Sequence, residues 1–309
     1  MPPSPPPRFH GIIPPIATPL AAPDQLDIPA LERLIEHLIL GGVHGLFVLG
    51  STGEAPSLSP TLRRSVITES IRITQRRIPV IVGITDTSLT ESIALAAFAA
   101  DANAAAVVAA PPFYFPITPA DLDRYYAALT AAVPLPLFLY NMPAFTKVPV
   151  SLATAERALQ NPRIIGIKDS SADMIQVHGL LQLASQRPDW SVFVGHEQLT
   201  AEAVLLGAHG GINAGANLLP AFYASLYNAA AAGDLATVRS LQPKAVQIAS
   251  LLYSVGPPAT SLVRGVKGTL ALLGICSDLM AEPLHAFSDP ERAELRRRML
   301  LCGLTPALP

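Results

Sequence analysis

Short apolar runs alternate along the chain with longer Ala- and Leu-rich segments. The runs have the length and residue types of strands, and the longer segments have those of helices. The eight predicted strands cover residues 11–18, 45–50, 79–85, 105–111, 136–141, 164–168, 191–195 and 210–215. Helices are predicted between them, for example over 27–42, 59–77, 88–102 and 118–133. Several open with Ser, Thr or Asp closely followed by Pro, which is typical of a helix start.

Strands that are apolar on both faces and alternate with helices favour a parallel sheet covered by helices. Eight such units predict an α/β fold, the (β/α)8 TIM barrel, over residues 9–232. An open doubly wound sheet is the competing fold, but its Gly-rich nucleotide-binding turn is missing from residues 16–27 (IATPLAAPDQLD). Residues 233–309 predict three further helices, which form a C-terminal helical extension. The proline-rich residues 1–8 predict a disordered tail.

Composition narrows the class of protein. Half of the 309 residues are hydrophobic, 14% are charged and the net charge is −2, as in a compact protein. This balance provides no basic face for nucleic acid and no reason to expect a membrane partner. Every apolar run is shorter than the roughly 18 residues that span a bilayer, the N-terminal residues do not resemble a secretory signal, and the two cysteines lack metal-ligand spacing. We expect a cytoplasmic protein without a bound metal.

In barrels of this kind the chemistry lies where the strands end, on the loops that lead into the helices. Three predicted strand ends carry reactive or anion-binding residues: GSTGE (50–54), YNMP (140–143) and KDSS (168–171). The chain has only four lysines, and Lys168 is the one that ends an apolar run, IIGI. A lysine, a tyrosine and a turn of small hydroxyl residues are therefore predicted at one mouth of the barrel.

This combination suits carbonyl chemistry. A neutral lysine amine attacks a ketone to form a Schiff base, which acts as an electron sink for the bonds beside it. The apolar residues before Lys168 favour the neutral amine by desolvation, and Tyr140 is placed to relay protons. The backbone N–H groups of the GSTG turn, with the hydroxyls of Ser51 and Thr52, form a nest for a carboxylate. The predicted substrate is a 2-keto acid, and the mechanism needs no cofactor.

Each residue also has a purely structural interpretation. Lys168 alone is a lysine that extends its amine from a strand end toward solvent, and Tyr140 alone is a core aromatic. The GSTGE turn alone caps a helix, with Glu54 favouring the helix dipole. Lys267 falls in a predicted helix. The joint occurrence at three strand ends favours the catalytic interpretation.

The sequence resembles the dihydrodipicolinate synthase/N-acetylneuraminate lyase family of Schiff-base lyases. The resemblance covers nearly all of residues 9–300, and GSTGEAPSLS, PPFYFP, YNMP, GIKDSS and GAHGGINAGAN occur in the family's order and spacing. It implies that Lys168 forms the Schiff base, that Tyr140 relays protons with support from Ser51, and that Ser51 and Thr52 hold the carboxylate of pyruvate. It also implies that Tyr114 reaches into a neighbouring subunit's site, within a homotetramer built as a dimer of dimers.

The family contains several activities, and departures from its motifs distinguish them. Dihydrodipicolinate synthases place an arginine where this chain has Phe145, which argues against that activity, because Lys147 nearby is a poor substitute for a bidentate guanidinium. The sugar-tail acids of N-acetylneuraminate lyase are only partly kept in GHEQ (195–198), and its hydroxyl residue after the eighth strand becomes Ala214. The last stretch is closer to the 2-keto-3-deoxy sugar acid aldolases, and GIKDSSAD also resembles 4-hydroxy-2-oxoglutarate aldolases.

The resulting expectation is a pyruvate-dependent aldolase acting on a 2-keto-3-deoxy sugar acid, 4-hydroxy-2-oxoglutarate or a sialic-acid-like substrate. The alternatives are 4-hydroxy-tetrahydrodipicolinate synthase, a related 2-keto-acid dehydratase and a non-catalytic 2-keto-acid-binding protein. The residues expected to contact the substrate are Ser51, Thr52, Gly53, Phe145, Ser170, Gly195, His196, Glu197, Gln198, Ile212 and Asn213. Glu197 and Gln198 also have the simpler interpretation of opening a helix, and Ser170 that of a helix cap.

Overall fold

The computed structural model describes residues 9–307. Eight parallel strands form one sheet in the order β1-β10-β9-β8-β7-β6-β5-β4. They are β1 (Gly11–Ile12), β4 (Leu46–Val48), β5 (Val80–Gly83), β6 (Ala106–Ala109), β7 (Leu137–Asn141), β8 (Ile164–Asp169), β9 (Ser191–Val194) and β10 (Gly210–Gly211). A parallel bridge between Pro15 and Phe47 joins the segment after β1 to β4. The sheet therefore closes on itself, and the predicted (β/α)8 barrel is confirmed.

The first and last strands are much shorter than predicted. The run 11–18 gives only Gly11–Ile12, because Pro14 and Pro15 have no N–H group to donate to a ladder. The chain still pairs beyond them, since the N–H of Ile16 donates to the carbonyl of Phe47 at 2.9 Å. The run 210–215 similarly ends as a strand at Gly211 and continues as the short helix η2 (Ala214–Asn217).

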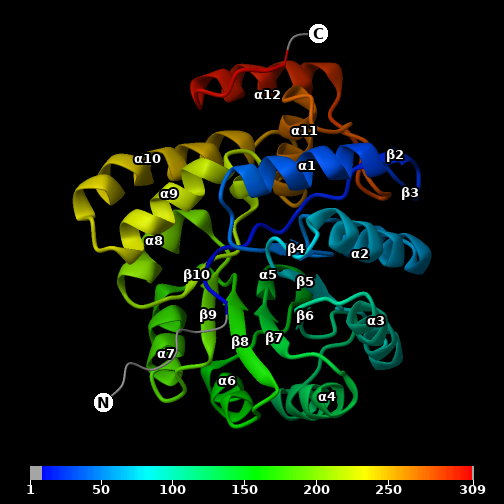
Figure 1. Ribbon diagram of the computed structural model, residues 1–309, viewed down its shortest axis with the longest axis vertical. Coiled ribbons are helices and arrows are strands. Elements are labelled where there is room, and N and C mark those ends of the chain that lie inside the picture. Colours follow the sequence, from blue (N-terminus) through cyan, green and yellow to red (C-terminus); the bar gives the residue numbers. More distant parts are fainter. Residues whose placement is uncertain (1–8, 308–309) are drawn as a thin grey trace.

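An outer layer of helices follows the strands one by one (Figure 1). These helices are α1 (Ile28–Leu40), α2 (Pro60–Thr74), α3 (Leu89–Asp101), α4 (Pro119–Ala132), α6 (Leu152–Leu159), α7 (Met174–Ala184), α8 (Glu197–Leu205) and α9 (Pro220–Ala231). The side chains of Asp27, Ser59 and Thr118 cap the N-termini of α1, α2 and α4, which carry Pro in the first turn as predicted. The loops hold the additional short elements β2 (Leu20–Ala22), β3 (Gln25–Leu26), η1 (Ala55–Ser57) and α5 (Pro143–Thr146).

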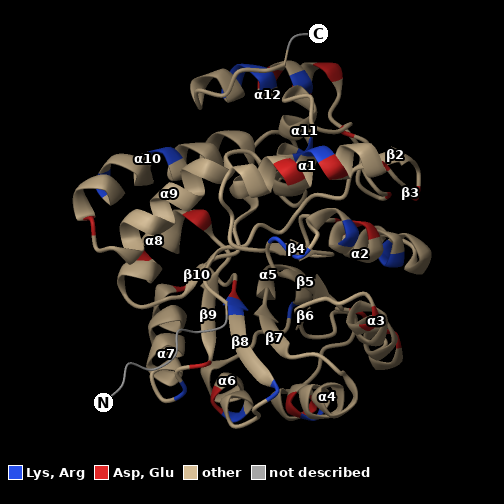
Figure 2. Cartoon of the chain, in the orientation of Figure 1, with Lys and Arg blue, Asp and Glu red and all other residues tan. Residues whose placement is uncertain are grey.

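The barrel has an inner core and an outer core. Alternate strand residues such as Phe47, Phe138 and Phe193 pack together inside the barrel, and Tyr140 closes this inner cluster. The intervening residues pack outward against the helices. Figure 2 shows that charged residues lie mainly on the outer helices. Among the eight strands only β8 carries charged residues, Lys168 and Asp169. Because side chains alternate along a strand, Lys168 lies on the inner face with Tyr140, and Asp169 lies on the opposite face beside Asn141.

Three helices follow the barrel: α10 (Leu235–Leu252), α11 (Ser261–Leu272) and α12 (Asp289–Leu301). They form the predicted C-terminal helical extension, in which α10 packs against α8 and α9, while α11 packs against α12 and η2 (Figure 1). The division of the chain at residue 232 stays a prediction, and the predicted tail 1–8 lies outside the described residues. Across residues 9–307 we find no helix that combines the length and apolarity needed to cross a membrane.

Candidate active site

The site is built around the ends of β7 and β8. Tyr140 and Lys168 are partners in the parallel ladder, so their side chains lie on the same side of the sheet. The Nζ atom of Lys168 lies 4.2 Å from the centroid of the Tyr140 ring and 5.2 Å from that of Phe47. The lysine is only 4% exposed, and among residues 9–307 no carboxylate forms an ion pair with it. This region thus contains a buried amine that faces aromatic rings and lacks a counter-ion.

Gly195, which follows β9, leaves room for the lysine side chain. A Cβ atom at this position would lie 3.3 Å from Cε of Lys168 and 2.0 Å from Oγ of Ser170. Ser170 is buried beside β8, where its N–H donates to the carbonyl of Asn141 at 2.8 Å. Gly195 therefore lies against the lysine side chain, and Ser170 lies against Gly195; both are predicted to contact the substrate.

The GSTGE turn after β4 brings hydroxyl and N–H groups to the same place. Oγ of Ser51 lies 3.4 Å from the hydroxyl oxygen of Tyr140. The N–H of Gly53 donates to Gly50 and that of Glu54 to Ser51, which tightens the turn. In residues 9–307 no acceptor takes a hydrogen bond from the N–H groups of Ser51 or Thr52. Two adjacent backbone donors are thus available for an anion.

A cavity of about 320 Å³ lies above this group and is bounded by Ser51, Tyr140 and residues of the C-terminal extension. Most of its lining is apolar. Its hydroxyl-bearing residues are Ser51, Ser57, Thr85, Tyr140, Thr146 and Thr260. Among residues 9–307, Glu54 is the one charged residue that borders it, so this part of the chain offers no cation in the cavity to a second carboxylate. Within the described part of the chain no cluster of three His, Cys, Asp or Glu residues could hold a metal ion.

Comparison with known proteins shows the family to which the chain belongs. A family model described as "Dihydrodipicolinate synthetase family" matches residues 8–300. The chain belongs to this family. It is therefore a lyase that works through a lysine Schiff base, in agreement with the resemblance stated from the motifs.

Relatives within the dihydrodipicolinate synthetase family carry different activities in their names. A probable 2-dehydro-3-deoxy-D-pentonate aldolase, YjhH of Escherichia coli strain K12, is 35% identical over 83% of this chain and 86% of its own length. The dihydrodipicolinate synthase structure from Bacteroides thetaiotaomicron is 50% identical, covers 95% of this chain and 99% of its own, and superposes with a TM-score of 0.92. The structure of YagE from Escherichia coli K12, in complex with pyruvate, is 32% identical, covers 96% and 99% of the two chains, and has a TM-score of 0.91.

The residues after β9 do not point together into the cavity. Glu197, the first residue of α8, is 3% exposed and accepts hydrogen bonds from the hydroxyls of Tyr253 at 2.6 Å and Tyr223 at 3.4 Å. Burial raises the pKa of Glu197 to about 7, and the two tyrosine hydroxyls offset this only in part. Gln198 is half-buried, and its backbone carbonyl accepts from the side chain of Gln242 on α10. The carboxyl of Glu197 therefore lies within the helical layer, and its contact with a substrate tail stays a prediction.

His196 and Asp169 lie closer to the lysine. Burial lowers the pKa of His196, although a hydrogen bond to the backbone of Ser170 and the Asp169 carboxylate act in the opposite direction. Burial raises the pKa of Asp169, because it disfavours the charged carboxylate. Asp169 accepts a hydrogen bond from the Asn141 amide at 2.6 Å. The His196 imidazole interacts with both Lys168 and Asp169, while Asp169 itself bonds to Asn141 and Ser171.

Two predicted residues after β10 are used structurally. Asn213 is fully buried, and its amide donates to the carbonyls of Val194 and Gly195 at 3.2 Å. It also exchanges hydrogen bonds with Thr200. Ile212 packs in the inner core of the barrel. These two residues support the wall behind β9, and their contact with a substrate tail stays a prediction.

Phe145 and Tyr114 are placed differently. Phe145 belongs to α5, is 48% exposed and borders the cavity. Tyr114 is 77% exposed and contacts the ring of Phe115, whereas Phe113 is the residue of this loop that borders the cavity. Gly53 and Thr52 remain in the turn, where the carbonyl of Gly53 accepts from the hydroxyl of Thr18 at 2.7 Å. The role of Tyr114 in a neighbouring subunit stays a prediction.

The sequence did not reveal the partner of Glu54. Instead of facing a helix dipole, its carboxylate accepts a hydrogen bond from Nζ of Lys267 at 2.6 Å. Both side chains are almost fully buried. The available signal was the pair of charged residues, Arg264 and Lys267, inside the predicted helix SLVRGVKGTLALLG, which indicates buried partners without identifying them.

Proposed function

We propose that this chain is a pyruvate-dependent class I aldolase in which Lys168 forms the Schiff base. The observation that carries the proposal is the buried amine of Lys168, which lies 4.2 Å from the centroid of the Tyr140 ring and pairs with no carboxylate of residues 9–307. The neutral form of a lysine amine is the nucleophile that attacks a ketone.

The reaction follows from the groups around the lysine. The amine attacks the C2 carbonyl of a 2-keto acid, and the carbinolamine loses water to give an iminium ion. Tyr140, assisted by Ser51, removes the proton of the C4 hydroxyl, so that the C3–C4 bond breaks, an aldehyde leaves and the electron pair moves into the enamine. Protonation at C3 and hydrolysis then release pyruvate and restore the amine.

The turn after β4 supplies the carboxylate site of this proposal. The N–H groups of Ser51 and Thr52 have no acceptor within residues 9–307, and the hydroxyl of Ser51 lies beside Tyr140. A carboxylate bound to these donors orients the keto group of the substrate toward the lysine. Thr52 thereby binds the substrate, and Ser51 both binds it and supports the proton relay.

For the substrate tail we favour a neutral, hydroxylated chain, so that the substrate is a 2-keto-3-deoxy sugar acid. The described residues that line the cavity include hydroxyl groups but no cation, and a second carboxylate buried there would be unpaired. This argues against 4-hydroxy-2-oxoglutarate, because its tail carries a second carboxylate and the aldehyde that leaves is itself an anion. The relative YjhH, named as a probable 2-dehydro-3-deoxy-D-pentonate aldolase, supports the same class.

The second candidate is 4-hydroxy-tetrahydrodipicolinate synthase. It is supported by the 50% identity with the structure named dihydrodipicolinate synthase. The apolar Phe145 and the lack of a cation in the cavity argue against it, because its second substrate, aspartate semialdehyde, carries a carboxylate.

Retro-aldol release of pyruvate separates these candidates. We expect turnover with 2-keto-3-deoxy pentonates or gluconates, and much weaker turnover with 4-hydroxy-2-oxoglutarate and sialic acid. Condensation of pyruvate with aspartate semialdehyde at a higher kcat/KM than any cleavage would support the synthase instead. The Lys168→Ala variant is the control for activity that does not pass through the site.

We also propose a homotetramer in the cytoplasm. Phe113, Tyr114 and Phe115 are neighbouring aromatic residues with exposed fractions of 38%, 77% and 72%, and an apolar patch of this kind is typical of an interface. Light scattering on the purified protein tests the assembly, and a monomer of 32.5 kDa at micromolar concentration would contradict it.

A further inference from the structure

Glu54 connects the carboxylate turn to the C-terminal extension. One carboxylate oxygen accepts from Nζ of Lys267 at 2.6 Å, and the other accepts from the N–H of Ala281 at 2.7 Å. Glu54 and Lys267 are 2% and 1% exposed. Since a buried ion is favourable only when its partners are well placed, this geometry fixes the end of the turn against α11.

The backbone of Glu54 depends on the same contacts. Its φ of 58° and ψ of 24° lie in the left-handed region, which is unfavourable for a residue with a Cβ atom. Such a conformation persists where the surroundings fix it. Hydrogen bonds from Gly53 to Gly50 and from Glu54 to Ser51 then transmit the position of Glu54 to the donors of Ser51 and Thr52.

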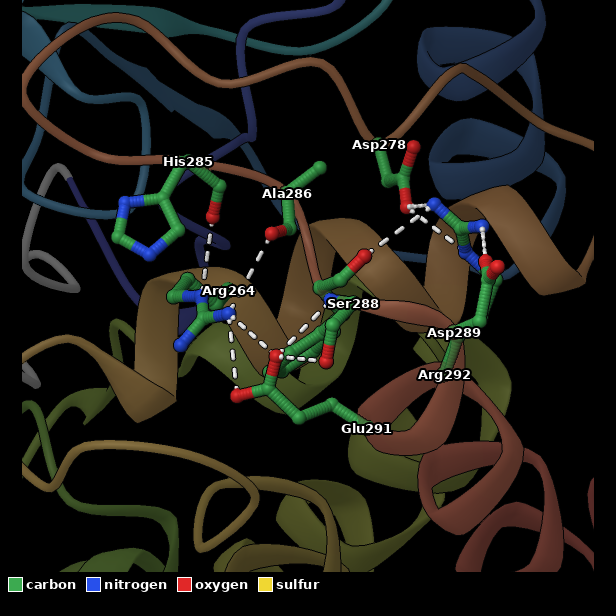
Figure 3. A network of polar contacts seen from close by, with 9 residues as sticks. Arg264, Asp278, His285, Ala286, Ser288, Asp289, Glu291 and Arg292 are labelled. Atoms are coloured by element: carbon green, nitrogen blue, oxygen red, sulfur yellow. Dashed lines mark hydrogen bonds and ion pairs between the residues drawn. The ribbon is translucent and has the colours of Figure 1, made fainter.

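Helix α11 also holds one wall of the cavity. Arg264 on this helix donates to the carbonyls of His285 and Ala286 and pairs with Glu291 on α12 (Figure 3). The wall segment 281–286 is thus held at one end by Glu54 and at the other by Arg264, and Pro283 and Leu284 between these ends border the cavity.

We propose that Glu54 and Lys267 are positioning residues for the keto-acid carboxylate. The pair fixes the Ser51–Thr52 donors relative to Lys168 and ties them to the wall that faces the substrate tail. Neither residue touches the reacting atoms. The inference rests on the proposed function, because it assumes that the carboxylate binds at this turn.

The test uses Glu54→Gln, Lys267→Met and the double variant, with Lys244→Met on α10 as the matched control. For each protein, the fraction of chain trapped at Lys168 by borohydride is measured against pyruvate concentration, and thermal stability is recorded in parallel. Each single variant should raise the pyruvate concentration for half-trapping by roughly 10- to 100-fold, because small displacements of a binding group have effects of this size. Lys244→Met should leave it unchanged.

The double variant separates positioning from general stability. Removing both charges leaves no unpaired buried ion, so thermal stability should recover relative to Lys267→Met. We expect the half-trapping concentration to stay raised, because the turn is no longer tied to α11. If pyruvate binding recovers together with stability, the pair is merely structural and the inference is overturned.

Two further outcomes are decisive. If Lys267→Met does not fold, Glu54→Gln provides the test, since the amide keeps the shape of the carboxylate and can still accept from Ala281. Folded variants with the half-trapping concentration of the parent would overturn the inference alone. A parent protein that forms no adduct at Lys168 would contradict both the inference and the proposed function.

Discussion

Two regions of the molecule contain a buried lysine. At the end of β8, Lys168 is 4% exposed and faces the rings of Tyr140 and Phe47. In α11, Lys267 is 1% exposed and donates to the carboxylate of Glu54 at 2.6 Å. Their burial is similar, and the difference between them is the counter-ion.

This difference assigns a different role to each lysine. The amine of Lys267 is engaged by the carboxylate of Glu54, so it is not available to attack a ketone. Lys168 is buried without a carboxylate partner among residues 9–307, and the hydroxyl groups of Tyr140 and Ser51, which lie 3.4 Å apart, are close to it. Burial alone is therefore a poor marker of a reactive lysine, whereas burial without a counter-ion at a strand end is a good one.

The largest expected effect is the loss of the amine of Lys168. The Lys168→Ala variant should lose activity by roughly 10³-fold or more, as is typical when a nucleophile is removed, and Lys168→Arg should be no better because a guanidinium stays protonated. Steady-state kinetics measure the effect, and circular dichroism checks the fold. Activity within tenfold of the parent would contradict the assigned role.

The next largest effect concerns the proton relay that distinguishes the surroundings of Lys168. Removing the hydroxyl in Tyr140→Phe should lower kcat by roughly 10²- to 10⁴-fold, the usual contribution of a positioned acid–base group. The ring next to Lys168 is retained, so imine trapping at saturating pyruvate should persist. An unchanged kcat would show that protons move by another route.

A third prediction breaks the counter-ion of Lys267. Lys267→Met leaves the Glu54 carboxylate buried and unpaired, which should lower the free energy of unfolding by about 3–5 kcal/mol. The Glu54→Gln/Lys267→Met double variant should lose much less. Urea denaturation measures both values, and strictly additive losses in the two single variants would contradict the ion pair.

Glu197 extends the comparison to carboxylates, because it is buried with two tyrosine hydroxyls and no cation. Its pKa is raised from an ordinary 4.5 to about 7 in the folded protein. Between these values the unfolded state has lost the proton and the folded state retains it, so the free energy of unfolding falls as pH rises. The expected fall from pH 4.5 to pH 7 is about 3 kcal/mol.

The Glu197→Gln variant is the control for this pH dependence. An amide does not titrate, so its unfolding free energy should change less than that of the parent over this pH interval. Urea denaturation at pH 4.5 and pH 7 provides the measurement. Parallel pH profiles in the two proteins would assign the dependence to other groups.

The sequence was informative where the pattern is local or follows from parallel strands. The eight strands came from apolar runs, and Lys168 and Tyr140 meet because consecutive strands of a barrel are neighbours. The pairing of Glu54 with Lys267 could not be predicted, since 213 residues separate them. Glu197 lies after a strand as expected, but the orientation of α8 directs its carboxyl to Tyr223 and Tyr253. The hydrophobic periodicity of the sequence does not predict how α8 is oriented relative to the barrel.

Borohydride reduction in the presence of pyruvate tests the central claim most directly. After proteolysis, mass spectrometry locates the reduced adduct among the four lysines of the chain. We predict one adduct, on Lys168, and none on the equally buried Lys267. An adduct on Lys267, or no adduct on any lysine, would contradict the account of the two buried amines.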